Sequence, residues 1–281
     1  MTPQDSAAVP ERQTPRISIV IVSFNRLAQL RDNLAALGTG FQIIVVDNGT
    51  GESLEQLAAE FPAVRLSRLP KNFGLTKALN IGLRSAEGEY ILCLHDDVKI
   101  TADAVLRLAD VLEARPDVGA VCPLLTDLAG KPIPQVRPLP TPGNPDPALR
   151  LPPEGEETAV ECITGAALLF RSFFLRALRQ VDERYGNYGS AIELSAQMRK
   201  AARKVIVLHS VTAIHEISPS PMRQSALAGD RAAGTAVFLA KHHGLVSGLV
   251  YRMKTAVTAL FTFRFSVATG CLSGQKIDGT A

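Results

Sequence analysis

The sequence predicts an α/β fold in which helices flank a Rossmann-like, mostly parallel central sheet. Apolar runs rich in β-branched residues occur at residues 17–23, 42–46 and 90–94, as is typical of strands buried on both faces. Between these runs, leucine and alanine recur at the spacing of an amphipathic helix. Strict alternation of strand and helix indicates parallel strands joined by right-handed crossovers.

Apolar runs and apolar residues at helical spacing also predict the remaining strands and helices. The strands expected in order span residues 17–23, 42–46, 64–69, 90–94, 118–122, 162–170 and 205–208. The expected helices carry the apolar stripes of residues 27–37, 54–61, 75–86, 105–112 and 192–202. Residues 132–153 are dense in proline and glycine, which predicts a long irregular loop.

Three parts of the chain are expected: a disordered polar tail at 1–15, a main domain at 16–220 and a C-terminal helical extension at 221–281. The extension holds a stripe of apolar side chains at helical spacing: Val246, Leu249, Val250, Met253, Val257, Leu260 and Phe261. Arg252, Lys254 and Arg264 lie among them. Such a basic amphipathic helix either rests on an anionic membrane surface or packs on the main domain or in a homodimer.

The composition limits the classes of binding partner and the cellular location that are expected. A formal net charge of +3 is too small to indicate a nucleic-acid partner. The four cysteines are scattered without the spacing of a zinc site or a disulfide framework. The N-terminal region lacks an apolar signal-peptide segment, and no charge-free run reaches the roughly 18 to 20 residues that span a bilayer. We therefore expect a cytoplasmic protein, with peripheral contact at the inner face of the membrane as an alternative.

The apolar run at 90–94 ends abruptly in His95, Asp96 and Asp97. Open parallel sheets bind ligands at the carboxyl ends of their strands, so these side chains are expected at a binding edge. Adjacent carboxylates repel each other unless a cation compensates, and a divalent metal carrying a diphosphate would do so. The alternative is a solvated turn before the next helix. The first strand lacks the GxGxxG and Walker A patterns, so phosphate must be held by another device.

Seven segments in order resemble the inverting glycosyltransferases of family 2 with the GT-A fold, especially rhamnosyltransferase-like members. They are IVSFNR at 21–26, VVDNGT at 45–50, NFGLTKALNIGL at 72–83, GEYILCLHDDV at 88–98, TGAALLFR at 164–171, VDERY at 181–185 and HEIS at 215–218. The resemblance covers most of the chain and implies a GT-A domain at residues 16–220.

The resemblance implies that Ser23, Asn25 and Asp47 line a nucleotide pocket, with Asp47 facing the base or ribose. By itself, Asp47 would equally form an Asx-turn that caps the following loop.

It also implies that Asn72, Gly74 and Lys77 approach the donor, where Lys77 would meet phosphate charge. An exposed helix lysine is the alternative for Lys77.

Asp97 matches the last acid of the family's DxD metal motif, and Asp96 its middle position on the nucleotide-sugar side. His95 replaces the first acid, either as a neutral metal ligand or as a polar residue at the strand edge. His215 matches a late histidine that helps to hold metal or diphosphate in relatives. The implied cofactor is Mg²⁺ or Mn²⁺.

The chain departs from the family at the general base. Relatives carry a Glu-Asp pair at the start of a late helix, where this chain has Ser190 and Ala191. Glu193 is the nearest carboxylate, and it becomes the expected base only if the helix begins after it, because residues two apart on a helix point to different faces. The alternative is a catalytically silent relative that binds nucleotide sugar or scaffolds a pathway.

The expected function is transfer of a sugar, with inversion, from a nucleotide-diphosphate sugar to a glycan or lipid-linked acceptor. A nucleotidyltransferase with a similar sheet is a second possibility, although the glycine-rich basic entry loop of that class is not seen in the sequence.

Overall fold

The computed structural model describes residues 15–49, 54–178, 180–216 and 224–273. The predicted tail at 1–15 therefore lies almost wholly outside the described residues. The strands are β1 (Ile17–Ser23), β2 (Gln42–Asp47), β3 (Arg65–Arg68), β4 (Tyr90–His95), β5 (Val98–Lys99), β6 (Val118–Thr126), β7 (Val136–Arg137), β8 (Glu157–Val160), β9 (Cys162–Ile163), β10 (Ala167–Arg171) and β11 (Lys204–His215). The helices are α1 (Leu27–Leu37), α2 (Glu55–Glu60), α3 (Leu75–Leu83), α4 (Ala102–Ala114), α5 (Ser172–Leu178), α6 (Ser190–Lys200), α7 (Gln224–His243), α8 (Leu245–Phe261) and α9 (Phe265–Ser273).

The main sheet confirms the predicted α/β class. Its strand order is β3-β2-β1-β4-β10-β6-β11-β5, with β8 paired to β11. The first four strands in sequence pair in parallel, as the alternation of strand and helix predicts. β10 is antiparallel to both β4 and β6, so the sheet is mixed in its second half.

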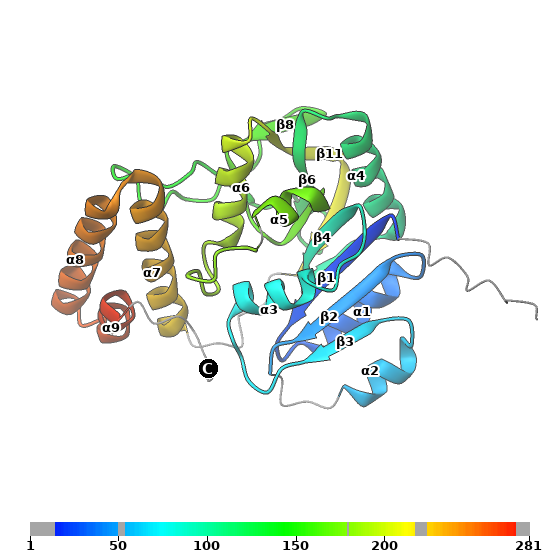
Figure 1. The fold of residues 1–281 in the computed structure, drawn as a ribbon, viewed down its shortest axis with the longest axis horizontal. Coiled ribbons are helices and arrows are strands. Elements are labelled where there is room, and N and C mark those ends of the chain that lie inside the picture. The colour runs from blue at the N-terminus through cyan, green and yellow to red at the C-terminus, as the bar shows by residue number, and fades with distance from the viewer. Residues whose placement is uncertain (1–14, 50–53, 179, 217–223, 274–281) are drawn as a thin grey trace, which may run out of the picture.

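Helices cover both faces of the sheet, as the alternation of side chains along β1 requires. Ile17, Ile19 and Ile21 face a core formed with α1 and α4, whereas Val20 faces a second core formed with α3 and α6. Figure 1 shows the helices on the two sides of the twisted sheet. Gly82 on α3 permits this close packing, because a Cβ there would lie 2.4 Å from a Val20 methyl carbon.

The predicted C-terminal helices are present as α7, α8 and α9, which form a separate group beyond α6 at the left of Figure 1. Small residues line their mutual core, and a Cβ on Gly248 would lie 2.6 Å from the Cβ of Ala240. Phe238 of α7 joins this group to Ile192 of α6 and to Tyr185, which lies in the loop before α6. No helix within the described ranges is both long enough and apolar enough to cross a bilayer.

Candidate active site

The strand ends bring the candidate residues to one edge of the sheet. β4 ends at His95, and the chain turns through Asp96 and Asp97 into the short strand β5. β5 pairs with the end of β11, which sets His215 opposite Val98. The backbone N–H of Glu216 donates to the Asp97 carbonyl oxygen at 2.9 Å and fixes this pairing. Residues more than a hundred positions apart are thereby held at one point.

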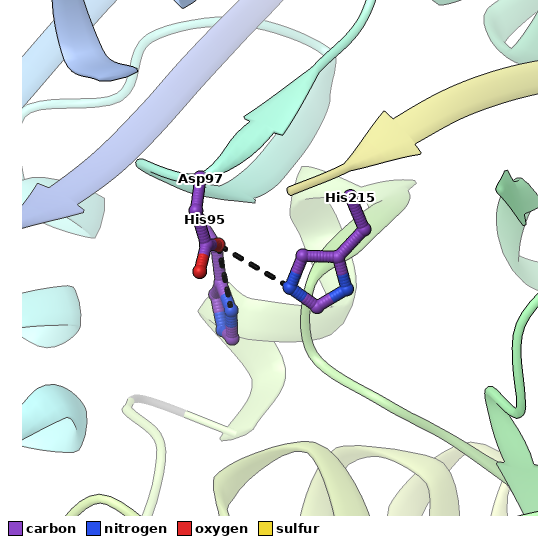
Figure 2. Close-up of side chains that lie close together, drawn as sticks. All are labelled: His95, Asp97 and His215. Atoms are coloured by element: carbon purple, nitrogen blue, oxygen red, sulfur yellow. Dashed lines mark ion pairs between the residues drawn. The ribbon is translucent and has the colours of Figure 1, made fainter. Parts of the chain in front are cut away.

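His95, Asp97 and His215 form a cluster whose possible ligand atoms all lie within 4.8 Å of one another (Figure 2). The Asp97 Oδ1 atom lies 3.4 Å from His215 Nε2 and 4.0 Å from His95 Nδ1. That Oδ1 atom is buried and accepts no hydrogen bond from the described residues. A buried carboxylate oxygen flanked by two imidazoles suits a divalent cation. Imidazole nitrogens are poor ligands for Mg²⁺, which takes oxygen ligands.

Arg26 is a site residue that the sequence analysis missed. Its guanidinium Nη1 forms an ion pair with Asp97 Oδ2 and lies 3.9 Å from Asp96 Oδ1. The backbone N–H of Phe24 donates to Asp96 Oδ2 at 3.2 Å. The two Asp97 oxygens therefore have different roles: Oδ2 faces Arg26, and Oδ1 faces the two histidines. The sequence signal was weak: Arg26 follows the end of the first strand by three residues, within the segment IVSFNR.

The surroundings of Asp96 and Asp97 shift the pKa values of these two carboxyl groups in opposite directions. Burial raises the pKa of Asp96 to about 6, and the neighbouring Asp97 charge adds to this shift. Burial would also raise the pKa of Asp97, but His215, His95 and Arg26 together hold it at about 2. Burial lowers the pKa of His95, which favours the neutral imidazole. Asp97 is thus ionised and His95 neutral near pH 7, the forms that bind a metal ion.

A cavity of about 280 Å³, here called the strand-end cavity, opens beside this cluster. Its lining consists of Val22, Phe24, Arg26, Asn48, Asn72, Leu75, His95, Asp96, Asp97, Asn187 and Leu227. Of the residues predicted from sequence, Asn72, His95, Asp96 and Asp97 therefore face it directly. Asn72 is held in place because its Oδ1 accepts from Asn48 Nδ2 at 2.9 Å and from the Gly74 N–H at 2.8 Å.

Other predicted residues surround the cavity without lining it. Ser23 and Asp47 are buried and lie opposite each other at the ends of β1 and β2. Asp47 Oδ2 is 3.3 Å from Arg68 Nε. Asn25 has a positive φ of 54°, in a turn that aims Arg26 at the acidic pair. Lys77 is exposed on α3, with its Nζ 4.4 Å from the centroid of the Phe73 ring.

Ser190 and Ala191, at the start of α6, lie next to His95. The three line a narrow apolar space together with Gly165. A Cβ on Gly165 would lie 3.2 Å from the Ala191 Cβ and 3.9 Å from His95 Nε2. The positions at which the family resemblance places its acidic pair therefore adjoin the candidate metal cluster.

Glu193 lies in the first turn of α6, because the helix begins at Ser190 and not after Glu193. The condition on which a base role for Glu193 depended is therefore not met. Its carboxylate is buried in a network with Tyr185 Oη at 2.9 Å, Gln197 Nε2 at 2.6 Å, Lys241 Nζ at 2.8 Å and His242 Nε2 at 2.8 Å. Burial alone would raise the pKa of Glu193, but these partners hold it at about 2. Such a carboxylate is a weak base, and its contacts fasten α7 to α6.

Glu193→Gln should lower the free energy of unfolding by about 3 kcal/mol, because it breaks a buried, hydrogen-bonded ion pair. The effect depends on pH. Since the folded pKa of Glu193 is about 2 and its ordinary value is 4.5, its stabilisation is complete above 4.5 and is lost as pH falls toward 2. Denaturant unfolding at pH 7, 4 and 2.5 should show the two proteins converging at low pH. Glu113→Gln, a change at a side chain that is 67% exposed, is the control. A constant difference at all pH values would contradict this account.

Comparisons with known proteins agree with the fold. A sequence model described as Glycosyl transferase family 2 matches residues 18–176. Poly-beta-1,6-N-acetyl-D-glucosamine synthase of Staphylococcus epidermidis is 27% identical over 117 residues, which are 39% of this chain and 28% of that protein. The chain thus matches less than a third of this relative's length.

Two solved structures share the architecture. S. aureus TarS 1-349 in complex with UDP-GlcNAc aligns with a TM-score of 0.61 and 15% identity, over 92% of this chain and 79% of that one. The mannosyltransferase PcManGT from Pyrobaculum calidifontis, in complex with GDP-Man and Mn²⁺, aligns with a TM-score of 0.57 and 15% identity, over 97% and 89%. At these identities the likeness establishes the GT-A type of fold.

Proposed function

This chain belongs to glycosyl transferase family 2, and we propose that it transfers a sugar from a nucleotide-diphosphate sugar to an acceptor hydroxyl, with inversion at the anomeric carbon. The observation that supports this most is the pairing of a buried Asp97 oxygen with two imidazoles at the rim of the strand-end cavity. The acceptor class is a glycan or lipid-linked saccharide of a cell-surface polysaccharide. A rhamnosyl donor is the subtype that the sequence resemblance favours.

In this proposal His95, Asp97 and His215 hold a divalent ion, Mn²⁺ in preference to Mg²⁺. The bound ion would neutralise charge on the departing diphosphate. Arg26, at 12% side-chain exposure, already compensates the acidic pair and lies where it can also contact phosphate oxygens. The protein's own contribution is thus a pre-organised set of metal ligands with one guanidinium beside the strand-end cavity.

The nucleotide would occupy the strand-end cavity on the β1 and β2 side. Asn72 offers a fixed amide to the donor, and Asp96 lines the same cavity. Ser23, Asn25 and Asp47 lie near the cavity at the strand ends, where Asp47 would meet base N–H groups or ribose hydroxyls. Gly74 begins α3 with a positive φ of 79°, and Lys77 lies one turn further on.

A thermal-shift screen tests the proposal. UDP, GDP and dTDP should each be tried with Mn²⁺ and with EDTA, because a ligand that binds only the native state raises the melting temperature. A ligand at 100 times its dissociation constant adds about 2.7 kcal/mol of stability. A shift with at least one nucleotide, larger with Mn²⁺ than with EDTA, is expected. No shift with any nucleotide would overturn the proposal.

We also propose that the outer face of α8 rests on an anionic membrane surface, at the inner face of the membrane. Its large apolar side chains are between 46% and 81% exposed: Leu245, Val246, Leu249, Val250, Met253, Val257, Leu260 and Phe261. Within the described residues this stripe does not pack on the main domain. Residues 245–273 include three cations and no carboxylate, so charge favours anionic lipid over a second protein surface.

Co-sedimentation with phosphatidylglycerol vesicles at low salt should show binding that the double variant Val246→Glu, Leu249→Glu abolishes. Both side chains lie on the exposed stripe, and buried carboxylates oppose insertion. Leu106→Glu, at a 40% exposed position on α4, is the control and should bind as wild type does. If wild type stays in the supernatant and elutes as a dimer that the double variant splits, the stripe is a homodimer interface.

A further inference from the structure

A second cavity, here called the helix-side cavity, has a volume of about 530 Å³ and lies between the loop before α6 and the helices α7, α8 and α9. Asn187 and Leu227 line both this cavity and the strand-end cavity, so the two adjoin. Its volume falls within the roughly 300–1,000 Å³ of small-molecule sites. A ligand here would lie beside a donor held at the strand ends.

The wall between the two cavities is rigidly held. The buried Asp230 of α7 accepts hydrogen bonds at Oδ2 from the backbone N–H groups of Asn187 and Tyr188, both at 2.9 Å. Gly186 permits this approach, because a Cβ there would lie 1.8 Å from Asp230 Oδ1. Gly234 is equally required, since its Cβ would lie 2.5 Å from the Tyr188 carbonyl oxygen. The site is therefore pre-formed, which lowers the entropic cost of binding.

The chemistry of the lining is that of a carbohydrate site. Asp146 offers a carboxylate, Arg231 a guanidinium, Tyr188 and Tyr251 phenol rings, and Thr255 a hydroxyl. Sugar hydroxyls both donate and accept, so they suit a wall that mixes carboxylates with cations, while the sugar's C–H face packs on aromatic rings. The lining holds two carboxylates, Asp146 and Asp230, and two cations, Arg231 and Arg264, so it carries no net charge that would favour an anion, and a purely apolar ligand would leave these groups desolvated.

We infer that the helix-side cavity binds the saccharide acceptor, whose attacking hydroxyl reaches the strand-end cavity past Asn187. The inference rests on the proposed function and extends it by placing the acceptor. α8 contributes Tyr251 and Thr255 to the cavity and carries the exposed apolar stripe on its outer side. A saccharide attached to a membrane lipid would therefore enter the cavity alongside α8, while its lipid stays in the bilayer on which the outer face of α8 rests.

Saturation-transfer NMR on the full chain tests this with the methyl glycosides of glucose, galactose, mannose, N-acetylglucosamine and rhamnose at millimolar concentration. At least one should receive saturation from wild type. Thr255→Trp, which fills the cavity, should remove the signal. Thr269→Trp, which adds the same bulk at an exposed position of α9 outside the cavity lining, should retain it. Arg231→Ala adds no bulk and should weaken affinity about tenfold, the loss of one charged hydrogen bond.

Calorimetry with UDP and Mn²⁺ on the same samples distinguishes a wrong acceptor assignment from a wrong proposed function. UDP binding should be equal in wild type and all three variants, because none of these positions lines the strand-end cavity. If UDP binds but no glycoside gives a signal, or if Thr255→Trp and Arg231→Ala both behave as wild type does, the acceptor assignment is overturned. If UDP and the other nucleotides fail to bind while glycosides do, the proposed function fails and the saccharide site remains.

Discussion

Asp97→Asn should abolish the Mn²⁺-dependent part of nucleoside-diphosphate binding while leaving the fold intact. The change keeps the size of the side chain but removes the charge that faces His95, His215 and Arg26. Removing an outer partner of a metal ligand costs about 10- to 100-fold in metal affinity, so losing a ligand itself should cost more. Titration calorimetry with UDP, in Mn²⁺ and in EDTA, measures the difference directly.

Asp110→Asn is the matched control, because it makes the same chemical change at a 64% exposed side chain on α4. This variant should bind nucleotide as wild type does. Equal affinity of wild type in Mn²⁺ and in EDTA would remove the metal from the proposal. Equal affinity of wild type and Asp97→Asn in Mn²⁺ would instead remove Asp97 from the metal site.

Ala191→Asp should raise the rate of sugar transfer by about 10² to 10⁴, the usual contribution of a general base. Ala191 lies beside Gly165 and His95, at the edge of the candidate metal cluster. A carboxylate there would restore the acid that the family resemblance places at this position. The measurement is release of UDP or GDP in the presence of acceptor, at saturating donor and Mn²⁺.

Ala191→Asn provides the matched control, because it has nearly the same shape and no basicity. If only the Asp variant gains activity, the wild type is a slow or silent enzyme for want of a base. Brisk transfer by the wild type, unchanged or reduced in Ala191→Asp, would show that another group accepts the proton. Nucleotide binding should be the same in all three proteins.

Local pattern was enough to predict most strands and helices. β1, β2 and β4 fall on the three apolar runs, and α3 and α4 on their stripes, because buried strands and amphipathic helices depend on residues near in sequence. The direction of β10 was not predictable, since an apolar run has the same appearance in a parallel or an antiparallel strand. The expected strand at 205–208 extends to His215 as β11, through an irregularity between Leu208 and Thr212.

Part of the candidate site was also predictable from local sequence pattern, because that pattern locates the strand ends. Asp97 and His215 follow strands, and strand ends gather at one edge. Arg26 escaped notice because its role depends on a partner 71 residues away. The position of Glu193 depended on contacts with Lys241 and His242 of α7, and no periodicity in α6 reveals them. Long-range ion pairs are the contacts of a site that are hardest to predict from a single sequence.

The antiparallel placement of β10 has a consequence for the order in which the chain can fold. β4 is synthesised long before β10, yet β10 supplies its neighbour along the whole of Tyr90–His95 apart from the strand's end. Until Arg171 has left the ribosome, one edge of β4 therefore carries unpaired backbone groups along an apolar strand, which is a template for pairing with other chains. In the folded sheet β6 does not cover that edge, because β10 lies between β4 and β6. The nascent chain thus depends on late closure of a central strand, a non-local event of the kind that slows folding.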